Sequence, residues 1–431
     1  MNWLLRSSIA RIFRSGTLTV TGPDGSSQTF GDGTGRPARL AIRTHRAERA
    51  ILVNPWMGVP EMYMAGEVEF PDGDIVHFLS LAYGNLATAR HSLTSRLFEG
   101  ISAAVRRLQQ INTAARARRN VHHHYDLSGD LYRLFLDEDM QYSCAYFERP
   151  DMSLEDAQRA KKRHIAAKLN LKPGNTVLDI GSGWGGLGLY LARRFEADVV
   201  GVTLSTEQHA VSVERAQNEG LDAHVHFELR DYRDISERFD RVVSVGMFEH
   251  VGLNHYPTYF NKCARLVKPD GVMLLHTIGR SAEPAATTPF IRKYIFPGGY
   301  IPSMSDMLPA IEKSGLIVTD IEILRLHYAE TLKHWRERFM ANRQKAVEIY
   351  DERFARMWEF YLAGSEASFR YGDLVVFQMQ LARRNDSLPL TRDYIGKCEK
   401  ALAMHELGHR TAGPGAKRPG GRNRRHPTAG R

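Results

Sequence analysis

One ten-residue segment of the chain reads Val177-Leu178-Asp179-Ile180-Gly181-Ser182-Gly183-Trp184-Gly185-Gly186. Its first half is an apolar run of the β type that ends near Asp179. Glycines follow at four of the next six positions, and residues 187–194 then carry the apolar spacing of a helix. The segment therefore predicts a strand, a tight turn and a helix N-terminus, where a polar ligand can approach bare backbone.

The form of this turn narrows the class of ligand. It reads Asp-x-Gly-x-Gly and lacks the Gly-Lys-Ser/Thr ending that cradles the phosphates of a nucleoside triphosphate. We therefore expect S-adenosylmethionine rather than a nucleoside triphosphate. Glycine-rich strand–helix turns also bind dinucleotides, so the turn alone leaves that second class open.

Strand–helix alternation continues on both sides of the turn, from about residue 150 to residue 277. The expected strands are Thr176–Ile180, Asp198–Thr203, His224–Leu229, Arg241–Val245 and Gly271–Thr277. The expected helices are Leu154–Leu169, Gly186–Phe195, Thr206–Glu219 and Tyr256–Leu266. This alternation predicts an α/β fold with a doubly wound parallel sheet, whose ligands lie at the carboxyl ends of the strands.

Length and local patterns divide the chain into four parts. Its 431 residues exceed what one core usually holds. The N-terminal part begins with an amphipathic basic helix over residues 1–16 and continues in short β-type runs, the last of them Ile51–Val53. We expect a small α/β module over residues 1–90, a basic linker helix over 91–120, a catalytic domain over 121–400 and a basic disordered tail over 401–431.

Composition sets further limits. No window approaches the eighteen apolar residues of a membrane span, and the first sixteen residues lack the apolar core of a signal peptide. The three cysteines form no Cys-x-x-Cys pair, which predicts no disulfide framework and favours a reducing cytoplasm. Residues 411–431 supply six of the nine net positive charges. We interpret them as a solvated tail, with binding to nucleic acid or anionic lipid as the alternative.

Polar residues follow several of the expected strands, in residues 201–208, 230–234, 246–252 and 276–279. Thr203 ends the second strand, where a dinucleotide site usually carries an acidic residue for the ribose hydroxyls. This departure weakens the dinucleotide interpretation.

These segments resemble the cyclopropane-fatty-acyl-phospholipid synthase family, in which Thr203 is usual. The matching segments are residues 124–127, 140–147, 178–186, 201–205, 231–234, 245–252, 276–279 and 293–299. The similarity runs from about residue 120 to about residue 385, and more weakly through the N-terminal module. It implies a Rossmann-like class I methyltransferase sheet with an added helical layer. It also implies an enzyme that transfers a methylene group from S-adenosylmethionine to the cis double bond of an unsaturated phospholipid acyl chain, forming a cyclopropane ring through a carbocation that bound bicarbonate deprotonates.

The resemblance also assigns site residues. The bicarbonate site would consist of Cys144, Glu249, His276, Ile278 (through its backbone) and Tyr328. The residues implied for S-adenosylmethionine are Tyr142, Ser143, Asp179, Gly181, Gly183, Thr203, Leu204, Gln208, Asp231 and Tyr232. The role of His250 stays open. We expect no metal site, because the consecutive histidines His122, His123 and His124 cannot easily converge on one ion.

The implied reaction requires aromatic rings that stabilise a carbocation and access to membrane lipid. A carbocation is stabilised by aromatic faces, for which Tyr142, Tyr146, Phe147, Phe248 and Tyr328 are the candidates. We expect residues 328–381 to form long aromatic-rich helices that help to wall an acyl-chain tunnel. The expected partners are membrane phospholipids, reached by a cytoplasmic protein that docks peripherally on the inner face of the membrane. A homodimer is allowed by the resemblance, and no nucleic acid partner is expected.

Three alternatives stand beside this interpretation. A related lipid methyltransferase would pass through the same cation but yield a methyl-branched or methylene-branched chain. A nucleic-acid or small-molecule methyltransferase would fit the basic tail, although the chain has no Asn/Asp-Pro-Pro-Tyr motif. A non-catalytic lipid-binding protein would have lost Cys144 or Glu249, and both are present.

Overall fold

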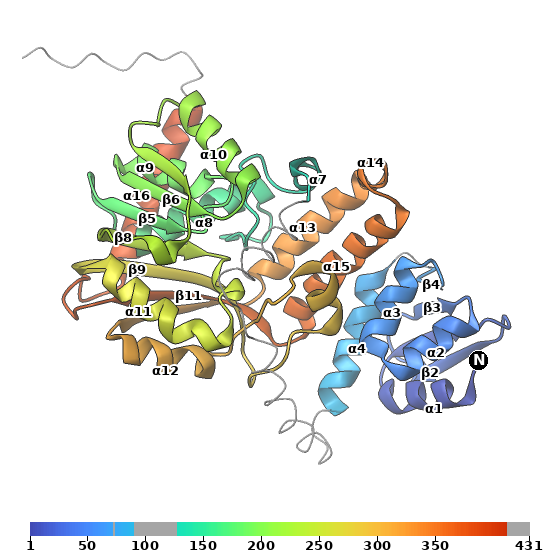
Figure 1. Ribbon diagram of the computed structural model, residues 1–431. Helices are drawn as coiled ribbons and strands as arrows, with labels where there is room; N and C mark the ends of the chain where they lie inside the picture. Colours follow the sequence, from blue (N-terminus) through green and yellow to red (C-terminus); the bar gives the residue numbers. More distant parts are fainter. Residues whose placement is uncertain (72–73, 90–126, 412–431) are drawn as a thin grey trace, which may run out of the picture.

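The computed structural model describes residues 1–71, 74–89 and 127–411 (Figure 1). The basic helix expected over residues 91–120 and the histidine run at 122–124 lie outside the described residues, as do residues 412–431 of the expected tail.

The N-terminal module combines a four-stranded sheet with four helices. The sheet has the order β2-β1-β3-β4, in which β1 pairs antiparallel with β2 and parallel with β3. Its elements are α1 (Trp3–Ile12), β1 (Thr17–Thr21), β2 (Ser27–Gly31), β3 (Ala38–Ile42), α2 (His45–Val53), α3 (Pro55–Met64), β4 (Val68–Glu69) and α4 (Ile75–Ala89). The predicted N-terminal helix is present but shorter, and it buries Leu5 and Ile9 on its inner face.

The strand expected at Ile51–Val53 is wrong, because these residues form the end of helix α2. Thr44 caps this helix by accepting a hydrogen bond from the backbone N–H of Ala47 at 3.1 Å. Ala47 and Ile51 are both buried, four residues apart on one helical face. The three-residue apolar run is therefore part of a helical stripe rather than a strand.

The second sheet has seven strands in the order β10-β11-β9-β8-β5-β6-β7. They are β5 (Thr176–Ile180), β6 (Asp198–Thr203), β7 (Val225–Leu229), β8 (Phe239–Val245), β9 (Val267–Arg280), β10 (Ile317–Leu324) and β11 (Leu374–Ala382). Strands β5 to β9 pair in parallel, and β11 runs antiparallel to both of its neighbours. The predicted parallel sheet is confirmed for five strands, and the antiparallel edge is an addition.

Helices cover both faces of this sheet (Figure 1). The core on one face joins Val177 of β5 to α8 (Leu154–Lys168), α9 (Gly186–Phe195), α10 (Thr206–Asn218) and α16 (Asp393–Thr411). The core on the other face joins Leu178 to α11 (Tyr256–Leu266) and α12 (Met304–Ser314). Consecutive residues of β5 are therefore buried on opposite faces, which explains the uninterrupted apolar run of its sequence.

The expectation of helices throughout residues 328–381 is wrong at its end. The helices are α13 (His327–Ala341), α14 (Arg343–Ile349) and α15 (Glu352–Tyr371), and the chain then enters strand β11. All residues of β11 after Leu374 are buried, because the strand lies between β9 and β10. A strand buried on both faces has no alternation that separates it from a buried helix. The expected tail also begins too early, since α16 continues to Thr411.

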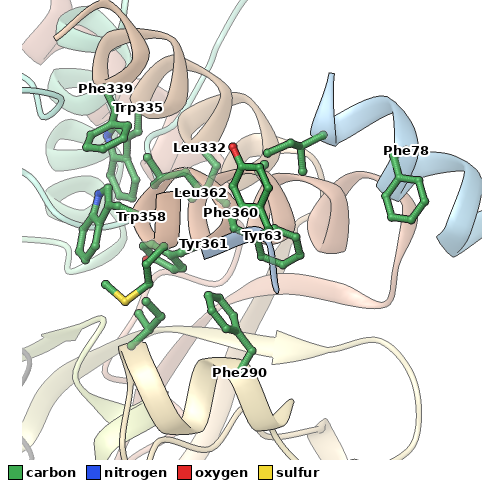
Figure 2. Packing of buried hydrophobic residues seen from close by; sticks show 14 of the residues in the cluster. Tyr63, Phe78, Phe290, Leu332, Trp335, Phe339, Trp358, Phe360, Tyr361 and Leu362 are labelled. Atoms are coloured by element: carbon green, nitrogen blue, oxygen red, sulfur yellow. The ribbon is translucent and has the colours of Figure 1, made fainter. Parts of the chain in front are cut away.

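Helices α13 and α15 form the added layer between the large sheet and the N-terminal module (Figure 1). Figure 2 shows the aromatic packing there, where Phe360 of α15 lies between Tyr63 of α3 and Phe290, with ring centroids 5.9 and 5.4 Å away. The hydroxyls of Tyr83 on α4 and Ser368 on α15 are 2.6 Å apart. The module is thus packed directly against the helical layer.

The remaining elements are single turns near the carboxyl ends of the strands. They are α7 (Gly129–Arg133), the 3₁₀ helices η1 (Tyr232–Asp234), η2 (Phe248–His250) and η3 (Leu253–His255), and the π-helical turn η4 (Ile291–Ile295).

Candidate active site

A polar cavity lies at the carboxyl ends of β5, β6, β7 and β8. All ten residues implied for S-adenosylmethionine line it, namely Tyr142, Ser143, Asp179, Gly181, Gly183, Thr203, Leu204, Gln208, Asp231 and Tyr232. They come from four separate segments, three of which follow β5, β6 and β7 at one edge of the sheet, while Tyr142 and Ser143 precede α8. We call this the cofactor cavity.

The glycine turn after β5 lines one side of this cavity. Gly181 has a φ of +83°, and a Cβ atom at this position would lie 2.8 Å from Cβ of Met247. Neither the backbone angle nor the space suits a side chain, so the close approach of β5 and the segment after β8 depends on glycine. This is the physical reason for the Gly-x-Gly spacing seen in the sequence.

Two oxygens beside this turn lack partners within the described part of the chain. They are Oδ2 of Asp179 and Oγ of Ser182, and both residues are buried. Burial raises the pKa of Asp179 to about 7, against an opposing effect of Lys161. Buried acceptors without donors fit a ligand that carries N–H or O–H groups and positive charge. The amino-acid end of S-adenosylmethionine carries an ammonium group and a sulfonium, so the residues present fit this ligand.

The other implied cofactor residues are held by hydrogen bonds among neighbours. Oγ1 of Thr203 donates to Oε1 of Gln208 at 3.1 Å. The carboxylate of Asp231 accepts hydrogen bonds from Nε and Nη2 of Arg233, at 2.9 and 2.6 Å. The hydroxyl and carboxylate are therefore pre-oriented rather than free to rotate.

Lys161 of α8 is a lining residue that the sequence analysis missed. Its Nζ donates to Oε1 of Gln141 and to Oγ of Ser143, both at 2.7 Å. Burial lowers the pKa of this ammonium to about 8. No local signal marks Lys161, because α8 carries five basic residues and only packing shows which one reaches the cavity.

A second, larger cavity of about 890 Å³ lies between the sheet, the helical layer and the N-terminal module. All five residues implied for bicarbonate line it, namely Cys144, Glu249, His276, Ile278 and Tyr328. The rest of the lining is mainly apolar and includes residues of α1, α3 and α4 such as Ile9, Val59 and Leu79. We call this the lipid cavity.

Glu249 is the polar centre of the lipid cavity. Its Oε1 accepts the backbone N–H of Ile278 at 2.6 Å, whereas its Oε2 is buried without a partner in the described residues. Burial raises the pKa of this carboxyl group. The backbone N–H of Ile278 is thus engaged by Glu249, so it orients the carboxylate instead of pointing freely into the cavity.

Cys144 and His276 flank this group as neutral side chains. Burial raises the pKa of the Cys144 thiol and lowers the pKa of the His276 imidazole. Both residues are almost completely buried. The thiol of Cys144 donates to the backbone carbonyl of Ala145 at 3.3 Å, so the neutral imidazole of His276 is the donor of this pair that a bound group can use, and Oε2 of Glu249 can accept one hydrogen bond. An oxyanion that carries one O–H group, such as bicarbonate, fits this set of donors and acceptors.

The two cavities meet. Tyr142, Ser143, Gly246 and His250 line both of them. Burial lowers the pKa of His250 to about 4, so this imidazole is neutral near pH 7. The open question about His250 is answered in part, since it lies where a group bound in one cavity faces a group bound in the other.

Of the five aromatic candidates for the carbocation, two line the lipid cavity and three do not. Tyr142 and Tyr328 face the cavity. Tyr146 instead stacks on His164 and His327, with centroids 4.1 and 5.0 Å away. Phe147 stacks on His334, and Phe248 is buried against Tyr256. Phe360, Tyr361 and Phe369 also line the cavity, as expected for the aromatic-rich helices of residues 328–381, whereas Phe290 and Phe296 are lining rings that were not predicted.

Comparison with known proteins identifies the family. The family model described as mycolic acid cyclopropane synthetase matches residues 112–379, which is more than half of the chain. The chain belongs to this family.

Individual relatives agree with the family. Cyclopropane-fatty-acyl-phospholipid synthase of Escherichia coli (strain K12) is 40% identical over 347 residues, covering 80% of this chain and 88% of that protein. Tuberculostearic acid methyltransferase UfaA1 of Mycobacterium tuberculosis is 38% identical over 375 residues, covering 82% and 87%. The solved structure of mycolic acid cyclopropane synthase CmaA1 complexed with SAH and CTAB is 37% identical. It gives a TM-score of 0.59 and covers 61% of this chain and 97% of its own.

The chain is therefore an S-adenosylmethionine-dependent methyltransferase of the cyclopropane-fatty-acyl-phospholipid synthase type, with the class I methyltransferase fold. The fold class and the type of enzyme predicted from the sequence are confirmed. The described residues contain no group of three or more His, Cys, Asp or Glu placed to hold a metal ion.

Proposed function

We propose that this enzyme adds a methylene group to the cis double bond of an unsaturated phospholipid acyl chain and closes a cyclopropane ring. The junction of the two cavities at Tyr142 and Gly246 carries this proposal. A polar cavity suited to S-adenosylmethionine opens into a large apolar cavity suited to an acyl chain. An alkene held there would face the methyl group at contact distance, which is the arrangement that a weak nucleophile needs.

Cys144, Glu249, His276 and Tyr328 would hold bicarbonate, with the backbone N–H of Ile278 orienting Glu249, and bicarbonate would supply the base for removing a proton from the new methyl group. The unpartnered Oε2 of Glu249 supports this role, because a buried acceptor needs a donor. The faces of Tyr142 and Tyr328 would stabilise positive charge on the acyl chain. The apolar lining would exclude the water that otherwise traps a carbocation as an alcohol.

The substrate would be reached from the membrane surface. No helix among the described residues is long and apolar enough to cross a bilayer. The N-terminal module exposes Trp3, Val53 and Trp56 by 73%, 84% and 48%, and Trp56 also lines the lipid cavity. Aromatic side chains at a cavity mouth suit the interfacial region of a bilayer. We propose that this part of the module contacts the membrane, and a homodimer stays a prediction.

The test is a product analysis with defined lipid. Purified full-length protein is incubated with S-adenosylmethionine and vesicles of a cis-monounsaturated phospholipid, with and without added bicarbonate, and the acyl chains are analysed by mass spectrometry and proton NMR. A gain of one methylene with upfield ring-proton signals supports the proposal. A gain of CH₂ with vinylic signals, or a gain of CH₄ with branched-methyl signals when a hydride donor is added, replaces it by the branching alternative. Equal turnover after rigorous removal of bicarbonate rules out bicarbonate as the base.

A further inference from the structure

A series of buried, hydrogen-bonded polar side chains packs against His276, on the side away from the lipid cavity. Gln378 of β11 is paired directly with His276 of β9, and its Nε2 lies 3.1 Å from Nδ1 of the imidazole. Both side chains are almost completely buried. The direction of this hydrogen bond can be either way, because an imidazole nitrogen can donate or accept.

Lys168, which is hydrogen-bonded to the other end of the Gln378 amide, resolves this ambiguity. Nζ of Lys168 donates to Oε1 of Gln378 at 2.8 Å. Burial lowers the pKa of the Lys168 ammonium, and its ion pair with Glu322 opposes this shift and favours the protonated form. A lysine ammonium has only donors, so the carbonyl oxygen of the Gln378 amide must face Lys168. The NH₂ group of the amide therefore faces His276.

We propose that Lys168 and Gln378 are positioning residues that hold His276 as the neutral tautomer protonated on Nε2. Because Gln378 donates, Nδ1 of His276 has to accept and carries no proton. The single imidazole proton is then on Nε2, where it provides a donor for an anion in the lipid cavity. The identity of that anion rests on the proposed function, whereas the tautomer rests on the side-chain chemistry alone.

The surroundings of these side chains support the assignment. Glu322 accepts from Lys168 and lies 2.7 Å from Nε2 of His164, whose Nδ1 lies 2.5 Å from Glu399. The ammonium group is thereby fixed from its far side. The pKa of His276 is lowered by burial first, and then by the positive charges of Lys161 and Lys168 and by His164 and His327. A second proton on Nδ1 would face both these cations and the NH₂ of Gln378.

The simpler explanation is that Gln378 only adds a hydrogen bond to a sheet. The same strand offers a matched control for it. Gln380 lies two residues further on β11, is equally buried and donates to Tyr394 at 2.6 Å and to the backbone of Lys168, without contacting His276. The substitutions Gln378→Glu and Gln380→Glu therefore introduce the same buried carboxylate on the same strand, and only the first changes what faces Nδ1.

The experiment reads the ring nitrogens directly. The full-length protein is labelled with ¹⁵N-histidine, the His276 signals are assigned by their loss in His276→Asn, and the ¹⁵N shifts report which nitrogen carries the proton. We expect an unprotonated Nδ1 in the wild type and in Gln380→Glu. In Gln378→Glu, which can only accept, we expect a protonated Nδ1. A protonated Nδ1 in the wild type overturns the proposal without the need for any variant.

Kinetics separate this proposal from the proposed function. We expect Gln378→Glu to lower turnover at saturating bicarbonate and to raise the KM for bicarbonate, each by about 10-fold. The KM for S-adenosylmethionine should stay unchanged. Equal losses in Gln378→Glu and Gln380→Glu would reduce Gln378 to a structural role and overturn the proposal. An unprotonated Nδ1 in a protein whose turnover ignores bicarbonate would leave the tautomer assignment intact and contradict only the proposed base.

Discussion

The cofactor cavity and the lipid cavity meet at Tyr142, but they are built in different ways. The cofactor cavity is lined mainly by short segments that follow strands of one parallel sheet, together with residues 140–143 and Lys161 of α8. The lipid cavity is lined by helices of the N-terminal module, by α13 and α15, and by β9, which lie far apart in the sequence. A polar ligand needs backbone and side-chain atoms at defined places, whereas an acyl chain needs only apolar volume. The first requirement leaves local motifs in a sequence, and the second does not.

The two cavities nevertheless share one electrostatic feature. Each contains a buried carboxyl group with one oxygen that has no partner among the described residues, Asp179 in the cofactor cavity and Glu249 in the lipid cavity. Burial raises the pKa of both groups. Two such costly groups placed on either side of the junction indicate that each awaits a ligand with donors. The following predictions test whether the two cavities can be disabled separately.

The largest effect is expected from Glu249→Gln. The amide keeps the shape but replaces the carboxylate that would hold bicarbonate, and without the positioned base turnover should fall about 100-fold or more. Affinity for S-adenosylmethionine, measured by calorimetry, should stay unchanged. Glu366→Gln is the matched control, since Glu366 is buried in ion pairs with Arg336 and Arg370 outside both cavities. Similar losses in both variants would contradict a special role of Glu249.

Leu79→Trp should narrow the lipid cavity from the side of the N-terminal module. Leu79 of α4 lines this cavity, and a larger ring there removes space for the acyl chain. We expect turnover to fall about 10-fold on long acyl chains and less on short ones, the size expected for overfilling an apolar site. Competition between lipids of two chain lengths in one reaction measures the ratio of turnover on long chains to turnover on short chains. Leu390→Trp, at an exposed position, should leave the ratio unchanged, and an unchanged ratio in both would remove the module from the acyl path.

Gly181→Ala should affect the cofactor cavity alone. Its Cβ would displace Met247 and strain a backbone with positive φ, at a cost of about 1–3 kcal/mol. We expect affinity for S-adenosylmethionine to drop several-fold while lipid binding to vesicles is retained. Gly220→Ala is the control, because Gly220 also has a positive φ of +64° but its Cβ would meet nothing within 4 Å. Normal cofactor affinity in Gly181→Ala would show that the turn tolerates a side chain.

The last prediction concerns the stability of the ligand-free protein rather than its activity. The pKa of Asp179 is raised to about 7, so the folded state binds a proton more tightly than the unfolded state does. Stability is therefore lost as the pH rises from about 4 to about 7, by roughly 4 kcal/mol at most for a shift of this size. Asp179→Asn removes this dependence. In urea unfolding, the free energy of unfolding of the variant relative to that of the wild type should be higher at pH 8 than at pH 5.5. The same difference between the two proteins at both pH values would contradict the raised pKa of Asp179.

The sequence analysis was most successful where local chemistry dictates structure. The ten cofactor residues were implied by the resemblance of short motifs, most of them beside strand ends, and all ten line one cavity. It failed for β11, whose residues are buried on both faces and therefore show no period, and for Ile51–Val53, whose cap at Thr44 was overlooked. It also missed Lys161, whose position depends on how α8 packs.

The amino-acid sequence alone determined the glycine turn, the alternation of strands and helices from about residue 150 to residue 277 and the family, because these depend on neighbouring residues and on backbone conformation. The tertiary structure alone decided which aromatic rings line the lipid cavity and that the two cavities join. It also decided the amide orientation of Gln378 behind His276, since Lys168 and Gln378 are 210 residues apart in the chain. Contacts of this kind depend on how helices and strands pack, and no local pattern of residues encodes them.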